Sequence, residues 1–266
     1  MSGRPLQARD PTGRSPAAPR RPAPAGGDWL RTVGQELGGI PRLLRHMRAT
    51  CELPGIEALD PALLRRLGVR GVVWDVDGTL MRRGDRSVAP GPQGALASLL
   101  AVPGVRHVIL SNCGEARFTE LATIFPDIPL LRIYRSAVGQ LVYRRRQGGE
   151  ERFRGASGQW RPFPPVAELE GARALRKPAA PLLRFALAEL GLENPAQAAV
   201  VGDQRLTDVA AASLAGCLSI KVPTLGRESF PVPVRLLQLA EEAAYRVLYR
   251  PLPAARLSRD SRAEAA

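Results

Sequence analysis

The middle of the chain alternates short apolar runs with longer amphipathic segments. The runs are rich in Val, Ile and Leu, whereas apolar positions between them recur every three or four residues. This alternation is typical of a parallel β-sheet covered by helices on both faces, because strands buried on both sides become continuously apolar. We predict strands at 71–74, 107–110, 130–133, 198–201 and 218–222, and helices at 93–100, 115–124, 180–190, 205–215 and 234–248. The last of these helices is amphipathic and is expected to pack against the sheet. A short helix through Leu67 is expected to begin at Pro61, with Asp60 as its N-cap.

The regions outside this α/β domain, which we place at 55–250, have other patterns. Residues 1–27 are rich in Arg, Pro, Ala and Gly and contain a single acid, which predicts a disordered basic tail. Residues 28–54 have apolar positions at helical spacing and form an amphipathic helical segment with a break near Pro41. Residues 251–266 are expected to be a disordered C-terminal tail.

One insertion, at about residues 136–170, interrupts the alternation. The sequences LVYRRR and ERFR flank QGGE, whose glycines predict a β-hairpin. Between Arg132 and Arg161 there are eight arginines and two glutamates. Two interpretations remain open: a solvated hairpin at the edge of the sheet, or a small flap that leans over the active site and contacts an anionic substrate.

The charge of the chain indicates an anionic partner. The net charge is +13 and the pI is near 11.0, which fits a phosphorylated substrate, a nucleic acid or an anionic membrane surface. An aromatic content of 5% argues against nucleic acid, because base stacking needs aromatic side chains. No apolar run approaches the roughly 20 residues that span a bilayer, so we expect at most peripheral membrane contact.

The basic and sulfur-containing residues add two constraints. Lys177 and Lys221 are the only lysines among 38 basic residues. Because nearly every other cation is arginine, a lysine can mark a position that needs a compact ammonium in place of a planar guanidinium. The three cysteines form no CxxC pair, which argues against a disulfide framework and a zinc site. We therefore expect a reducing cytoplasm, and favour a bacterial cytosol over an organelle. The oligomeric state stays open.

Two acids directly follow the first predicted strand. In VVWDVDGTL, Asp75 and Asp77 stand where the strand passes into a turn. Ligands of open α/β sheets bind at this carboxyl edge, and side chains two apart point to the same side. The two carboxylates repel each other unless a cation lies between them, and Mg²⁺ is the hard ion that prefers oxygen ligands. Gly78 lets the backbone approach a phosphate, and Thr79 adds a hydroxyl donor.

A second pair of acids lies in VVGDQRLTD. Asp203 follows a predicted strand and is placed to ligate a metal ion across the sheet edge from Asp75. Asp208 lies in the following helix, where it either supports the metal site or bonds loop amides as a structural acid.

Two further motifs supply neutral and cationic donors. Ser111 and Asn112 end a third strand in VILSNC, where they suit phosphate oxygens, although such residues are also common in turns. In LRKPAA, Lys177 precedes a helix that starts near Pro178, so an ammonium and helix N-terminal amides can meet one anion.

In the order DVDGT, SN, KP and GDxxxTD, these residues resemble the four signature motifs of the haloacid dehalogenase superfamily, over about residues 55–248. The resemblance implies a Rossmann-like fold and a phosphatase in which Asp75 becomes transiently phosphorylated. It implies that Asp77 protonates the leaving oxygen and then activates water, and that Ser111 and Lys177 stabilise the phosphoryl group. Mg²⁺ would be held by the Asp75 carboxylate, the Asp77 carbonyl and Asp203.

GVRGVVWDVDGTL and GDQRLTDV are also similar to the YqeG-type branch, which includes mitochondrial phosphatidylglycerophosphate phosphatases. This implies a lipid head-group phosphate as substrate. The chain departs from that branch at Gly78, where Asn is usual, and in the long path from Asn112 to Lys177.

The short path from Leu80 to Val108 leaves no room for a large cap, so the site is expected to be open. Two alternatives remain: a phosphatase acting on a soluble nucleotide, sugar phosphate or macromolecule, and a non-enzymatic basic binding protein.

Overall fold

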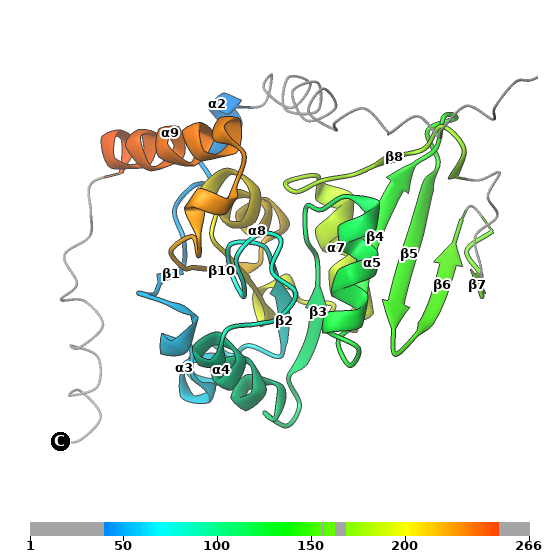
Figure 1. Cartoon of the computed structure of the whole chain (residues 1–266), viewed down its shortest axis with the longest axis horizontal. Helices are drawn as coiled ribbons and strands as arrows, with labels where there is room; N and C mark the ends of the chain where they lie inside the picture. The colour runs from blue at the N-terminus through cyan, green and yellow to red at the C-terminus, as the bar shows by residue number, and fades with distance from the viewer. Residues whose placement is uncertain (1–39, 156, 163–168, 250–266) are drawn as a thin grey trace, which may run out of the picture. The chain divides into compact units, whose positions relative to one another are not determined.

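The computed structural model describes residues 40–155, 157–162 and 169–249 (Figure 1). The predicted tails at 1–27 and 251–266, and most of the predicted helical segment 28–54, lie outside the described residues. Of that segment, the structure describes α2 (Ile40–Leu44) and the stretch that follows it.

Within the described residues, ten strands form one sheet with a parallel core. The parallel strands are, in spatial order, β1 (Cys51–Glu52), β10 (Leu218–Lys221), β9 (Ala198–Gly202), β2 (Gly71–Trp74), β3 (Arg106–Ile109) and β4 (Leu130–Arg135). All five predicted strands are confirmed, and β4 is longer than expected. β1 was not predicted, because two residues are too few to produce a hydrophobic pattern.

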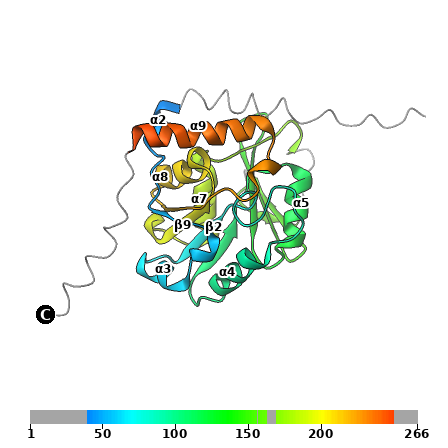
Figure 2. The same ribbon diagram turned by 60° about the vertical axis from the view of Figure 1, so that its left-hand side comes forward.

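Helices cover both faces of the sheet, as the apolar runs predicted (Figure 2). Alternate residues of β2 point to opposite faces: Val72 and Trp74 belong to one buried cluster, and Val73 belongs to the other. The first cluster is covered by α3 (Pro61–Arg66), α4 (Pro90–Leu100) and α5 (Glu115–Ile124), and the second by α7 (Ala180–Glu189) and α8 (Ala210–Ala215). This is the Rossmann-like α/β arrangement expected from the sequence. The remaining helical turns are η1 (Ile56–Ala58), η2 (Pro195–Gln197), η3 (Arg205–Val209) and η4 (Arg227–Ser229).

The insertion forms an antiparallel extension of the sheet. β5 (Leu141–Gln147) pairs with β4, β6 (Glu150–Arg154) pairs with β5, and β7 (Trp160–Arg161) pairs with β6. The short strand β8 (Arg173–Ala174) returns to pair with β4. The predicted hairpin is therefore confirmed, and it continues the sheet edge to edge (Figure 1).

The arginines of this extension are used within it and against the flanking helices. Arg144 pairs with Glu115 of α5 at 2.6 Å, and Arg145 pairs with Glu189 of α7 at 2.5 Å. The Arg154 guanidinium lies over aromatic rings of β5, β7 and α7. The described contacts therefore correspond to the edge-hairpin interpretation, and no flap over the active site is formed by the described strands.

The last helix, α9 (Val232–Leu248), differs from the sequence prediction. Its amphipathic pattern suggested packing of the apolar side against the sheet. In the structure the buried residues of α9 are Gln238 and Glu241, whereas Leu236 and Leu239 are exposed by 61% and 52%. The prediction was wrong because ion pairs of the buried Arg205, described below, hold the polar side of α9 against the domain. No helix in the described part of the chain has the length and apolar character needed to cross a membrane.

Candidate active site

Three aspartates meet at the carboxyl edge of the parallel strands. β2 and β9 are neighbours, and the Asp75 amide donates to the Val201 carbonyl at 2.9 Å, so Asp75 and Asp203 leave the sheet side by side. Asp208 joins them from η3. One carboxylate oxygen from each of the three lies within 4.8 Å of the other two, and the residues are only 6%, 3% and 2% exposed. Such a cluster of hard oxygen ligands can hold a divalent cation.

Lys177 lies inside this cluster. Its Nζ donates to Asp75 Oδ1 at 2.7 Å and to Asp208 Oδ1 at 2.5 Å, and the residue is 3% exposed. Burial alone would lower the pKa of Lys177, but Asp208 and Asp75 raise that pKa above its ordinary value. The ammonium is therefore permanently charged, and it neutralises only part of the negative charge around it.

The negative charge that Lys177 does not neutralise affects the pKa values of Asp75 and Asp203. Burial raises the pKa of Asp75; Asp208 and Asp203 act in the same direction, and Lys177 opposes them. Burial and Asp208 also raise the pKa of Asp203. The Oδ2 atom of Asp203 is buried without a hydrogen-bond partner among the described residues. An unsatisfied buried carboxylate oxygen is costly, so this atom is a natural ligand for a cation.

Thr79 connects the two strand ends. Its Oγ1 lies 3.3 Å from Asp75 Oδ2 and 3.5 Å from Asp203 Oδ1. A hydroxyl has one proton to donate, so it can satisfy only one of these carboxylates at a time.

Asp208 bonds a loop amide and also lies in the carboxylate cluster, and its part in a metal site stays a prediction. Its Oδ2 accepts a hydrogen bond from the Gln204 amide at 3.1 Å, while its Oδ1 faces Lys177. The close approach requires Gly202, because a Cβ there would lie 2.3 Å from Asp208 Cγ. Asp208 is thus both a loop-bonding acid and a member of the carboxylate cluster.

Gly78 is required by its backbone and its neighbours. Its φ of +98° lies in a region that side chains disfavour, and a Cβ there would lie 2.9 Å from Asp203 Oδ2 and 3.0 Å from Phe230 Cζ. Glycine therefore keeps the turn after Asp77 closely packed against the second acidic loop.

Asn112 bonds the backbone of Lys177, and its predicted contact with a phosphate stays a prediction. Its Oδ1 accepts from the Lys177 amide at 2.8 Å, and its Nδ2 donates to the Lys177 carbonyl at 3.2 Å. Both halves of the side-chain amide are thus used to fix the backbone of the lysine. Ser111 lies half-buried at the same edge, directly after Leu110, whose amide bonds the last residue of β2. Its contact with a phosphate stays a prediction.

Asp77 lies apart from the three clustered carboxylates. Arg117, in the first turn of α5, donates from Nη2 to Asp77 Oδ1 at 2.6 Å and from Nε to Oδ2 at 3.3 Å. The same guanidinium binds Glu120 at 2.7 Å and the Asp85 carbonyl at 2.7 Å. The sequence analysis missed Arg117. The one available signal was a cation in the first turn of a helix, where the helix dipole disfavours it.

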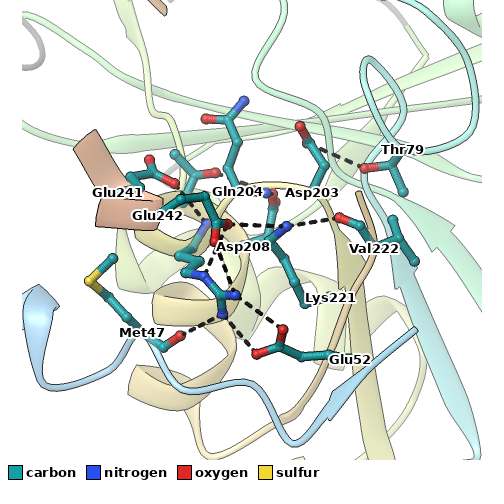
Figure 3. A network of polar contacts seen from close by, with 12 residues as sticks. Met47, Glu52, Thr79, Asp203, Gln204, Asp208, Lys221, Val222, Glu241 and Glu242 are labelled. Atoms are coloured by element: carbon teal, nitrogen blue, oxygen red, sulfur yellow. Dashed lines mark hydrogen bonds and ion pairs between the residues drawn. The ribbon is translucent and has the colours of Figure 1, made fainter. Parts of the chain in front are cut away.

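A second polar network, also missed from the sequence, supports the acidic loop of η3 (Figure 3). Arg205 is 3% exposed and donates to Glu52 at 3.0 and 3.1 Å and to Glu242 of α9 at 3.1 and 3.3 Å. Glu241 of α9 accepts from the Arg205 amide at 2.9 Å. The second lysine, Lys221, belongs here as well, since its Nζ lies 3.6 Å from Glu242 Oε1 and donates to the Val222 carbonyl at 2.9 Å.

Comparison with known proteins relates part of the chain to a family model. Residues 174–229 match the family model described as HAD-hydrolase-like, and this segment contains Lys177, Asp203 and Asp208. No curated protein and no solved structure matches the chain at a significant level. The match supports the resemblance to the haloacid dehalogenase superfamily and indicates a hydrolase of the phosphatase type.

Proposed function

We propose that the protein is a Mg²⁺-dependent phosphomonoester hydrolase that works through an aspartyl-phosphate on Asp75. The observation that carries the proposal is the buried cluster of three carboxylates and one ammonium at the carboxyl edge of the sheet. Phosphoryl transfer depends mainly on positioning and charge stabilisation, and this cluster concentrates charge at one fixed point.

The donor set fits magnesium. All candidate ligands are oxygens, and Asp203 Oδ2 is buried without a partner among the described groups. Asp75 and Asp203 would hold the ion, with Asp208 beside them and, by resemblance, the Asp77 carbonyl. When bound, Mg²⁺ supplies positive charge that neutralises the phosphoryl oxygens.

The side chains have complementary roles in the reaction. An Asp75 oxygen attacks phosphorus, and the bond from phosphorus to the leaving oxygen breaks as Asp77 gives that oxygen a proton. Asp77 then removes a proton from water, whose oxygen attacks the phosphorus of the aspartyl-phosphate and releases phosphate and free Asp75. Lys177 stabilises the transferring group, Asn112 fixes the Lys177 backbone, and Arg117 orients the Asp77 carboxylate.

For the substrate we propose phosphatidylglycerophosphate, on the strength of the resemblance to the YqeG-type branch. The described part of the chain has a short connection between β2 and α4 and a hairpin that extends the sheet, which supports an open site suited to a bulky substrate. A soluble phosphate ester is the alternative, since it would use the same catalytic residues.

Phosphate release from phosphatidylglycerophosphate and from a panel of soluble phosphomonoesters, with Mg²⁺ or with EDTA, tests both parts. We expect Mg²⁺-dependent release that is fastest on the lipid, and a loss on the order of 10⁴-fold or more in Asp75→Asn. Release from soluble esters alone would reject the lipid substrate and keep the mechanism. No release from any ester by a folded, Mg²⁺-loaded protein would favour the non-enzymatic binding protein.

A further inference from the structure

The two sides of α9 are the reverse of what a core helix shows. Toward the domain, α9 presents the buried Gln238 and Glu241 and the half-buried Glu242, and the two glutamates bond Arg205. Toward solvent it presents large aliphatic side chains, with exposed fractions of 60% for Val232, 61% for Leu236, 52% for Leu239 and 84% for Val247. These residues are three, four and eight apart, so they form one stripe along the helix.

The charges of this stripe have a single sign. Arg235 and Arg246 are exposed beside it, and they are eleven residues apart, which places them on the same side of the helix after three turns. The two acids of α9, Glu241 and Glu242, are turned inward. The exposed side of α9 is therefore apolar and cationic, with no acid among its described residues.

More cations lie next to the helix. Tyr249, directly after α9, donates to the Leu44 carbonyl at 2.6 Å, so the stretch around Leu44 lies beside the end of α9. In that stretch Arg42, Arg45 and Arg48 are exposed. A second copy of this surface would bring arginine toward arginine without an acid between them, so self-association lacks charge complementarity. An anionic surface has the missing charge.

The stripe lies at the same end of the sheet as the carboxylate cluster. The loop before α9 contacts the turn that follows Asp77, since the Leu225 amide donates to the Gly78 carbonyl at 2.7 Å. Glu241 of α9 also accepts from the amide of Arg205, two residues after Asp203. Helix α9 is therefore anchored to both loops that carry acids of the candidate active site.

We propose that α9 docks on the surface of an anionic lipid bilayer. The aliphatic stripe enters the interface between head groups and acyl chains, while Arg235 and Arg246 contact lipid phosphates; this combination characterises helices that lie in the membrane plane. The docking itself does not depend on catalysis. Its consequence, that the site receives a phosphorylated lipid from the same bilayer, rests on the proposed function.

Sedimentation of the full chain with vesicles tests the proposal. We expect binding to vesicles of phosphatidylcholine with phosphatidylglycerol, weaker binding to phosphatidylcholine alone, and weakening by salt. Leu236→Glu with Leu239→Glu should lower the partition coefficient on the order of a hundredfold, because it removes apolar area and adds repulsion. Arg235→Gln and Arg246→Gln should each lower it roughly fivefold.

Val138→Glu is the matched control, since Val138 is 80% exposed in the turn between β4 and β5. It also replaces an exposed aliphatic side chain with glutamate, adding one negative charge away from α9, and should leave binding within about twofold of wild type. Equal vesicle binding by wild type and the Leu236/Leu239 double variant would overturn the proposal. So would absence of binding by wild type, or a change of oligomeric state in the double variant, which would assign the stripe to a second copy.

Activity on a soluble phosphate ester separates the two proposals. The double variant should keep that activity, because neither leucine belongs to the site. Asp75→Asn should lose activity and still bind vesicles. Vesicle binding without any phosphatase activity in wild type would reject the enzyme and retain the docking helix.

Discussion

The carboxyl edge of the parallel strands and the antiparallel extension are both rich in charge, but they balance it differently. At the edge, three buried carboxylates share one ammonium, and one carboxylate oxygen has no described partner. In the extension, Arg144, Arg145 and Arg154 find acids or aromatic rings. Buried charge that stays unbalanced needs a further ion or substrate, whereas balanced charge holds strands and helices together.

Removing the only cation of the cluster is expected to have the largest effect. Lys177→Met leaves the Asp75 and Asp208 carboxylates buried without their counter-ion, and should lower the free energy of unfolding by about 3–5 kcal/mol in urea without Mg²⁺. Asp208→Asn added to this variant should recover part of the loss. A further loss that simply adds to the first would contradict the role of charge.

In the extension, Arg145→Met removes a half-buried ion pair with Glu189 and should lower the free energy of unfolding by only about 1 kcal/mol.

Arg117 provides a test at the border of the site. Arg117→Gln removes the donors that orient Asp77 and should lower kcat by about 10–100-fold with little change in KM. The pH profile of kcat should also shift, because Asp77 acts as acid and base. Arg117→Lys should recover only part of kcat, since lysine lacks the planar fork. A change in KM alone would indicate a contact with substrate instead.

Mg²⁺ should stabilise the protein more as the pH rises. Burial raises the pKa of Asp75 and of Asp203, so the folded protein holds these protons more tightly than the unfolded chain. Their contribution to stability is present below the ordinary carboxyl pKa and is lost as pH rises toward the raised values. The Tm with EDTA should therefore fall between about pH 5 and pH 8, and Mg²⁺ should raise the Tm more at the higher pH.

Asp203→Asn is the control for this effect. The substitution removes the carboxylate whose Oδ2 has no described partner. It should raise the free energy of unfolding of the metal-free protein by about 1–2 kcal/mol and reduce the rise in Tm that Mg²⁺ causes. If Mg²⁺ raised the Tm of this variant as much as that of wild type, the ion would bind elsewhere.

The smallest effect is expected at the exposed tip of the extension. Arg152 and Glu150 pair at 3.0 Å with side chains 53% and 65% exposed. Arg152→Gln should change the free energy of unfolding by less than about 0.5 kcal/mol, because water screens the pair. A loss comparable to that of Lys177→Met would remove the contrast between the two regions.

Local pattern predicted most of the secondary structure. Helix α5 and strand β2 lie where the sequence placed them, and Asp60 caps α3 by accepting from the Leu63 amide at 2.6 Å, as its position before Pro61 indicated. These features depend on residues close in sequence. Arg117 and Arg205 were missed because their partners are 40 and up to 158 residues away.

The sequence by itself determined the α/β fold, the order of the motifs and the choice of Asp75, Asp203 and Lys177, because buried strands and strand-end carboxylates leave a local pattern. The tertiary structure alone decided that Asn112 fixes the lysine, that Asp208 joins the cluster, and that the apolar side of α9 is exposed. The physical reason is that an amphipathic helix can be anchored by either side. Here the contacts of the buried Arg205 with Glu241 and Glu242 outweighed the hydrophobic pattern, and the local sequence contains no sign of these distant contacts.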